Sequence, residues 1–185
     1  RYLDWNGADA YADSIEGALL LLNGLPSRSG FLWLEQMLPL FLGKQQESGI
    51  VEGWYGDGNY ARTALMAGLY YTQGTMAQPW RSDLQWSARR DGQRLRVVLT
   101  SPEDWQGRLR FDVPRHRLHV GLPVNYPRLN EFPEWFVVEP EDRYRAQVGR
   151  EPVRRLRGAD LAAGLPVTVP AGKRVAVEVW PDPAG

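Results

Sequence analysis

The sequence predicts an α+β protein in which an α-helical segment, residues 1–78, precedes an antiparallel β-sandwich, residues 79–185. Two observations predict this order. Apolar residues recur at helical spacing up to about Gly74, and after Pro79 they alternate with polar residues as in half-buried strands. The polar, proline-containing stretch from Thr75 to Ser82 separates the two patterns and places the boundary between them.

Three helices are expected in the first part, the first over residues 8–24. The second covers residues 29–46, and we expect Pro39 to kink or divide it because proline lacks a backbone donor. The third begins near Asp57 or Asn59, which are both good capping residues, and continues to residue 74. This third helix is apolar on nearly every side, so two neighbours cannot enclose it. We therefore expect a missing N-terminal portion, a partner chain or a second copy to cover the helices.

Seven short strands are expected in the second part, which matches an antiparallel β-sandwich. The Asp91-Gly92 pair predicts a two-residue hairpin between the first two strands. The turn of residues 170–173 predicts a similar connection between the last two. The strands are expected at residues 84–88, 95–99, 109–113, 118–120, 135–138, 167–169 and 175–179.

Composition excludes some classes of function. The 22 basic and 22 acidic residues balance, so the sequence lacks the charge expected of a protein that binds nucleic acid or an anionic membrane. Without cysteine there is no disulfide framework, thiolate nucleophile or cysteine metal site, and the compartment stays open. The longest apolar run, residues 18–22, is too short to span a bilayer, so we expect a soluble chain. Because the chain starts at Arg1 rather than Met, we also expect a trimmed or processed N-terminus.

Residues 49–63 are the richest candidate for a functional site, because glycines, aromatic rings and charges gather there at the start of a helix. Glycine lets a backbone approach a ligand closely, and flat rings beside charged groups suit sugar recognition. The structural alternative is that Asp57 or Asn59 caps the helix, that the glycines make the turn, and that Arg62 forms an ion pair. The candidates are Glu52 and Asp57 as catalytic groups, and Trp54, Tyr55, Asn59, Tyr60 and Arg62 as substrate-binding groups.

Helix pairs closed by a glycine- and aromatic-rich loop and followed by a sandwich resemble the C-terminal end of α/α-toroid carbohydrate-active proteins. These are glycosidases and polysaccharide lyases of heparinase or alginate-lyase type, and residues 54–60, Trp-Tyr-Gly-Asp-Gly-Asn-Tyr, are the nearest motif. The resemblance is architectural and assigns no catalytic residue. It implies a toroid that holds a saccharide cleft and a sandwich that closes one side of it.

The leading function is therefore the C-terminal portion of a polysaccharide-processing enzyme, a glycoside hydrolase or polysaccharide lyase, with a saccharide site near the turn of residues 52–62. The alternative is a non-catalytic carbohydrate-binding module, or a structural module that docks on another chain. No cofactor is expected. A polysaccharide or oligosaccharide partner slightly favours a periplasmic or extracellular location.

A second group of carboxylates lies in the first predicted helix. Asp9, Asp13 and Glu16 fall within about 60° of one another at helical spacing, so they form one stripe opposite the apolar face. Paired carboxylates suit glycoside hydrolysis or a hard cation such as calcium, and the alternative is a solvated face. Asp13 and Glu16 are the catalytic candidates of this group because they lie deeper in the helix.

The two histidines and one long segment complete the candidates. His116 and His119 are expected on opposite faces of a strand, one packed and one exposed, and are poor partners for a shared metal. Residues 121–135 are too irregular for a strand, and long ordered loops are often functional. We expect Tyr126 to help line a groove between the two domains, together with Arg128, Asn130 and Trp135. The alternative is a proline-braced crossover that packs Phe132 and Trp135 into the core.

Overall fold

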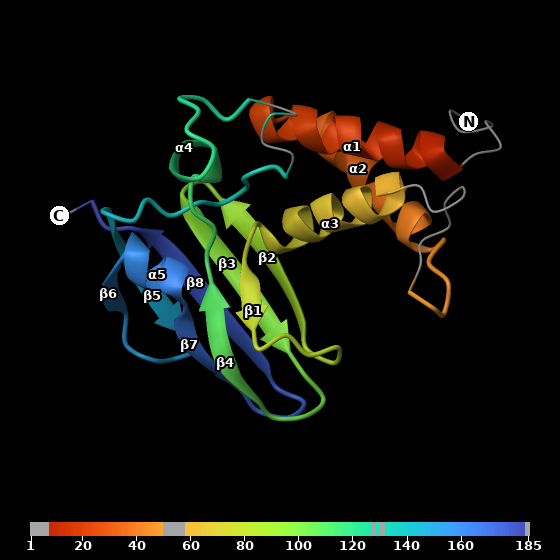
Figure 1. Ribbon diagram of the computed structural model, residues 1–185. Helices are drawn as coiled ribbons and strands as arrows, with labels where there is room; N and C mark the ends of the chain where they lie inside the picture. The colour runs from red at the N-terminus through yellow and green to blue at the C-terminus, as the bar shows by residue number, and fades with distance from the viewer. Residues whose placement is uncertain (1–7, 50–57, 127–128, 130–131, 184–185) are drawn as a thin grey trace. The chain divides into compact units, whose positions relative to one another are not determined.

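The computed structural model describes residues 8–49, 58–126, 129 and 132–183. It contains helices and two antiparallel sheets, which confirms the α+β class (Figure 1). The chain divides into two compact units. One, here the helical unit, comprises Arg1–Tyr70 and Tyr126–Pro133, and the other, here the sheet unit, comprises Tyr71–Asn125 and Glu134–Gly185.

The first helices follow the apolar periodicity closely. Helix α1 spans Ala8–Gly24, as predicted, and α2 spans Arg28–Leu42. Ser27 caps α2, because its side chain accepts a hydrogen bond from the backbone N–H of Gly30 at 3.4 Å. Pro39 was expected to kink or divide this helix, and it does not divide it. Pro39 lies in the last turn with its ring exposed, where one missing donor does not interrupt the helix.

Helix α3 spans Gly58–Thr72, and its last two residues belong to the sheet unit. Rings of Phe31 in α2 and Tyr70 in α3 stack with centroids 6.1 Å apart. The expected uncovered apolar face of α3 is only partly present: Met66 is fully buried within this chain, Leu69 is half-buried and Leu65 is 60% exposed. None of the described helices is long and apolar enough to cross a membrane.

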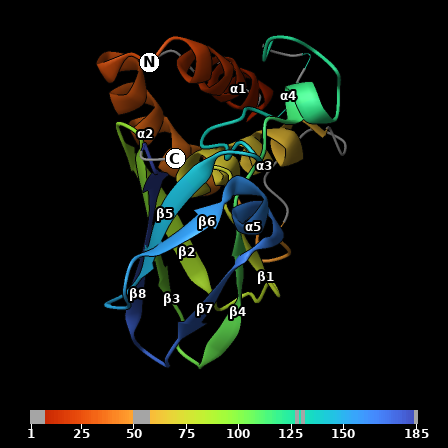
Figure 2. The same cartoon turned by 90° about the vertical axis from the view of Figure 1, so that its left-hand side faces the viewer.

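The sheet unit contains two antiparallel sheets (Figure 2). The three-stranded sheet has the order β1-β4-β7, with β1 at Met76–Gln78, β4 at Trp105–Arg110 and β7 at Leu165–Val169. The five-stranded sheet has the order β2-β3-β8-β5-β6. Its strands are β2 Gln85–Asp91, β3 Arg94–Thr100, β5 Arg143–Val148, β6 Arg154–Arg157 and β8 Arg174–Pro181. Two short helices complete this unit, α4 at Arg115–Leu118 and α5 at Gly158–Ala163.

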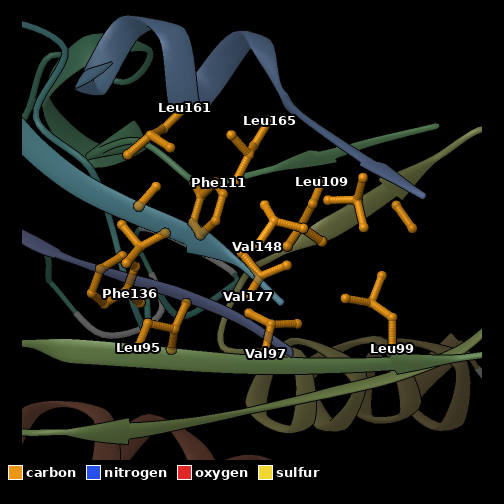
Figure 3. Close-up of a cluster of buried hydrophobic side chains, with 14 of the residues drawn as sticks. Leu95, Val97, Leu99, Leu109, Phe111, Phe136, Val148, Leu161, Leu165 and Val177 are labelled. Carbon is orange, nitrogen blue, oxygen red and sulfur yellow. The ribbon is translucent and has the colours of Figure 1, made fainter. Parts of the chain in front are cut away.

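One hydrophobic core takes side chains from both sheets (Figure 3). Leu95, Val97 and Leu99 point into it from β3, because successive residues of a strand face opposite sides. Leu109 enters from the three-stranded sheet and Leu161 from α5, and both are fully buried. Every second residue of β3, β5 and β8 therefore packs in or against the core, and the residues between them face away from it.

The connections correct several expectations. The predicted hairpin between β2 and β3 is confirmed, with Asp91 paired to Arg94 and Gly92 at a φ of 57°. The turn of residues 170–173 does not make a hairpin, because β7 and β8 belong to different sheets and the turn carries the chain between them. Residues 118–120 form no strand, since α4 ends at Leu118, and within 135–138 only Val137 forms an isolated bridge.

Candidate functional site

The site expected at the start of α3 is described in part. Asn59, Tyr60 and Arg62 lie in the first turns of α3 and can be placed. Glu52, Trp54, Tyr55 and Asp57 lie outside the described residues, and so does the grouping of Trp54 and Asp57 with Arg62.

Arg62 forms an ion pair between two helices of the helical unit. Its Nη2 donates to Glu16 Oε2 of α1, and the same nitrogen donates to Asn59 Oδ1 at 3.1 Å. The Glu16 side chain is 6% exposed and that of Arg62 is 31% exposed. The pair thus meets the requirement that a buried charge have a partner, and it confirms the structural alternative for Arg62.

Neighbouring contacts fix the same turn of α3 against the other helices. The Tyr60 ring stacks on Phe41 of α2 with centroids 5.6 Å apart, and Tyr60 is 2% exposed. The Thr63 hydroxyl donates to the backbone carbonyl of Ala12 in α1 at 3.2 Å. Tyr60 was expected to bind substrate, but in this structure its ring packs in the core because the period of the helix turns it toward α2.

The carboxylates expected to form one stripe on α1 differ in their exposure to solvent. Asp13 is exposed, whereas Glu16 is buried against Arg62, so Glu16 does not lie on a face opposite the apolar side. Glu16 lies in the apolar face because its carboxylate is paired there with Arg62, a partly exposed arginine of a neighbouring helix. Asp9 lies in the first turn of α1.

A histidine–carboxylate pair in the sheet unit was not expected. His116 Nδ1 lies 2.8 Å from Glu134 Oε2, and the backbone N–H of His116 donates to Glu134 Oε1 at 2.7 Å. The side chains are 14% and 4% exposed. His119 is exposed and ends the short helix α4. One histidine is packed and one exposed, as expected, but both lie at α4 rather than on a strand.

This pair lies beside a second buried carboxylate. Arg115 Nε donates to both carboxylate oxygens of Asp112, at 3.0 and 3.1 Å. The backbone N–H of Val113 donates to Asp112 Oδ1 at 2.9 Å. Burial raises the pKa of Asp112 above its usual range, although Arg115 opposes this shift. A carboxylate on Nδ1 orients an imidazole as in many general bases, but Glu134 also binds the first turn of α4. The same contacts thus hold the segment before α4 to the segment that follows Pro133.

A third polar cluster holds the loops at one end of the sheet unit. Arg81 donates to both Asp83 oxygens, to the Ser101 hydroxyl at 2.7 Å and to the Asp104 carbonyl at 2.8 Å. The guanidinium holds the pKa of Asp83 below its usual range. An open hollow of about 440 Å³ adjoins this cluster and is lined by Asp83, Gln85, Thr100, Ser101, Pro102 and Gly172.

The remaining candidates belong to the long segment. Tyr126 is 43% exposed and is grouped with the helical unit, whereas Trp135 is half-buried and is grouped with the sheet unit. Arg128 and Asn130 lie outside the described residues. Within the part of the chain that the structure describes, no three His, Asp or Glu side chains gather as a metal site would require.

Comparisons of the chain with protein-family models, with curated proteins and with solved structures found no match.

Proposed function

We propose that this chain is the C-terminal part of a polysaccharide-processing protein, a glycoside hydrolase or polysaccharide lyase. In this proposal α1 to α3 belong to an α/α toroid and the sheet unit is a β-sandwich. The saccharide site includes the turn of residues 52–62. The two-part organisation and the helical ion pair at the start of α3 support this assignment.

The observation that carries the proposal is the apolar surface of the helical unit. Five leucines within the described part of residues 8–70 of this unit are more than half exposed, although soluble monomers rarely expose large contiguous apolar patches. An apolar hollow of about 370 Å³ lies where α1 turns into α2, and Leu22 and Trp33 are among its lining residues. Further helices of the same toroid would cover such a surface. The exposed side chains are Leu21, Leu25, Leu32, Leu40 and Leu65.

Arg62 is one of the described residues of the proposed saccharide site. Its guanidinium has five N–H donors, and the structure uses one nitrogen for both Glu16 and Asn59. The side chain is 31% exposed and its Nε is buried, so the other terminal nitrogen, Nη1, is the donor that we propose for a ligand hydroxyl or carboxylate. The pair with Glu16 therefore both stabilises the start of α3 and orients the arginine.

Binding of oligosaccharides tests the proposal. A panel of neutral and uronic-acid oligosaccharides would be titrated by calorimetry into the chain and into the variant Asp57→Asn. Asparagine caps a helix about as well as aspartate, so this variant is expected to lose affinity without losing thermal stability. Asp160→Asn in α5 is the matched control, because Asp160 accepts a hydrogen bond from the Arg157 N–H at 3.0 Å at another helix start. Absence of binding to every oligosaccharide, or a loss that matches a loss of stability, would contradict the proposal.

A further inference from the structure

We propose that the open face of the five-stranded sheet binds an anionic polysaccharide through a row of arginines centred on Trp180. This surface, the arginine face, comprises Arg94, Arg96, Arg143, Arg145, Arg155 and Arg157 with Trp180. It lies within the sheet unit. The inference therefore does not depend on the helical unit or on the function proposed above.

Strand register places these side chains side by side. Arg145 of β5 is paired with Trp180 of β8 on one side and with Arg155 of β6 on the other. Two residues further along the same pair of strands, Arg143 of β5 is paired with Arg157 of β6. The alternate residues of the same strands, among them Tyr144 and Val179, are buried in the core. The period of two therefore directs this set of arginines away from the core.

The centre of the arginine face is an arginine stacked on a tryptophan. The guanidinium carbon of Arg94 lies 4.2 Å from the centroid of the Trp180 ring, a cation–π contact. Arg94 Nη1 also donates to Glu178 Oε2 at 3.0 Å, and Arg96 lies 3.9 Å from the other oxygen of Glu178. The Arg94 side chain is still 50% exposed, so the group is oriented but open to a ligand.

A buried carboxylate orients the next two arginines. Asp182 has a side chain that is 2% exposed, and it accepts from Arg145 at 2.9 Å and from Arg155 at 3.0 Å. The Arg155 side chain is 66% exposed. One acid thus holds two guanidinium groups on neighbouring strands and leaves a net positive charge between them. Guanidinium groups that are already oriented can bind a carboxylate or sulfate group with little further loss of side-chain entropy.

The spacing of charges favours a sugar chain over nucleic acid. The row crosses β3, β8, β5 and β6, whose neighbours lie about 4.8 Å apart, so the arginines of β5 and β6 are one strand spacing apart and those of β3 and β5 are two, with Trp180 between them. Duplex DNA carries one negative charge per roughly 1.7 Å of its axis. The carboxylates of Glu178 and Asp182, which lie among the arginines, would repel phosphates at that charge density. Twenty of the 22 basic residues are arginine, and residues 79–185 carry 18 of the basic residues but 14 of the acidic ones. The neutral charge of the whole sequence therefore conceals a basic sheet face.

The test compares two double variants that each remove two arginines. Arg94→Gln with Arg155→Gln removes two exposed members of the arginine face, while Arg96 remains on Glu178 and Arg145 remains on Asp182. Arg108→Gln with Arg110→Gln is the matched control on the exposed side of β4, where both arginines donate to backbone carbonyls. Binding to polygalacturonate, dextran sulfate and neutral dextran would be measured at low and physiological salt, with thermal unfolding to confirm folding.

We expect the chain to bind the two anionic polymers and not neutral dextran. We expect the first variant to bind at least tenfold more weakly and the control less than twofold more weakly. Equal losses in both variants would overturn the proposal, because any positive charge would then serve. Absence of binding at low salt would also overturn it, and so would tighter binding to a thymidine oligonucleotide or to poly-glutamate at matched charge.

Discussion

Replacing Arg62 with alanine should destabilise the helical unit by about 2–3 kcal/mol. Breaking a buried ion pair on one side costs roughly 3–5 kcal/mol when both groups are buried. Here the Glu16 side chain is 6% exposed but that of Arg62 is 31% exposed, so solvent screening reduces the expected cost. Glu16→Gln should cost only about 1 kcal/mol, since the amide oxygen still accepts from the guanidinium.

Urea unfolding followed by far-ultraviolet circular dichroism measures these changes, and the double variant completes a thermodynamic cycle. We expect the double variant to be more stable than the sum of the two single changes predicts, because the two charges interact. Arg28→Ala is the control, since Arg28 is exposed at the start of α2, and it should change stability by less than about 0.5 kcal/mol. A cost below about 1 kcal/mol for Arg62→Ala, or additive single changes, would refute the reasoning.

Two further predictions concern one glycine from each unit and two carboxylates of the sheet unit. Gly158→Ala should cost about 3 kcal/mol, because the added Cβ would lie 1.9 Å from the backbone oxygen of Glu139. Gly17→Ala in α1, where nothing lies within 4 Å, should instead stabilise the chain by about 0.5–1 kcal/mol, and urea unfolding of both variants would show the contrast. Asp112 and Asp83 should respond to pH in opposite directions. The folded-state pKa of Asp112 is raised, so its contribution to stability is largest below the unfolded pKa and is lost as pH rises through the folded value. The folded-state pKa of Asp83 is lowered, so its contribution is present above the unfolded pKa and is lost as pH falls through the folded value. Lowering the pH from 7 toward 4 should therefore favour the wild type over Asp112→Asn, whereas the loss relative to Asp83→Asn should appear only below the unfolded pKa of about 3.9. Equal pH dependence of the two comparisons in unfolding experiments would contradict this.

The sequence predicted those elements whose pattern is local. The bounds of α1 follow from helical spacing and a terminal glycine, and the hairpin after β2 follows from Asp91-Gly92. Strand β5 alternates polar and apolar residues and was overlooked, whereas β6 was missed because Arg154 stands where an apolar residue would complete the alternation. The turn of residues 170–173 was read as a hairpin because local turn residues do not reveal which sheet the next strand joins.

The candidate site likewise shows that local patterns do not predict contacts between separate elements. Arg62 was expected to form an ion pair on energetic grounds alone, and it does. Its partner Glu16 was placed on an open face, because the spacing within one helix carries no information about a charge supplied by another helix. The pairing of His116 with Glu134 joins residues 18 positions apart, and the arginine face joins four strands. Such contacts depend on topology, which composition and periodicity do not determine.

Sedimentation velocity on this chain over a range of concentrations tests the central claim most directly, namely that the helices belong to a larger helical assembly. We expect a mean mass above the monomer mass of 21.0 kDa that rises with concentration, because leucines of the helical unit are exposed. We also expect the double variant Leu21→Gln with Leu65→Gln to associate less. A stable monomer at every concentration, with no binding of a hydrophobic dye, would contradict the account.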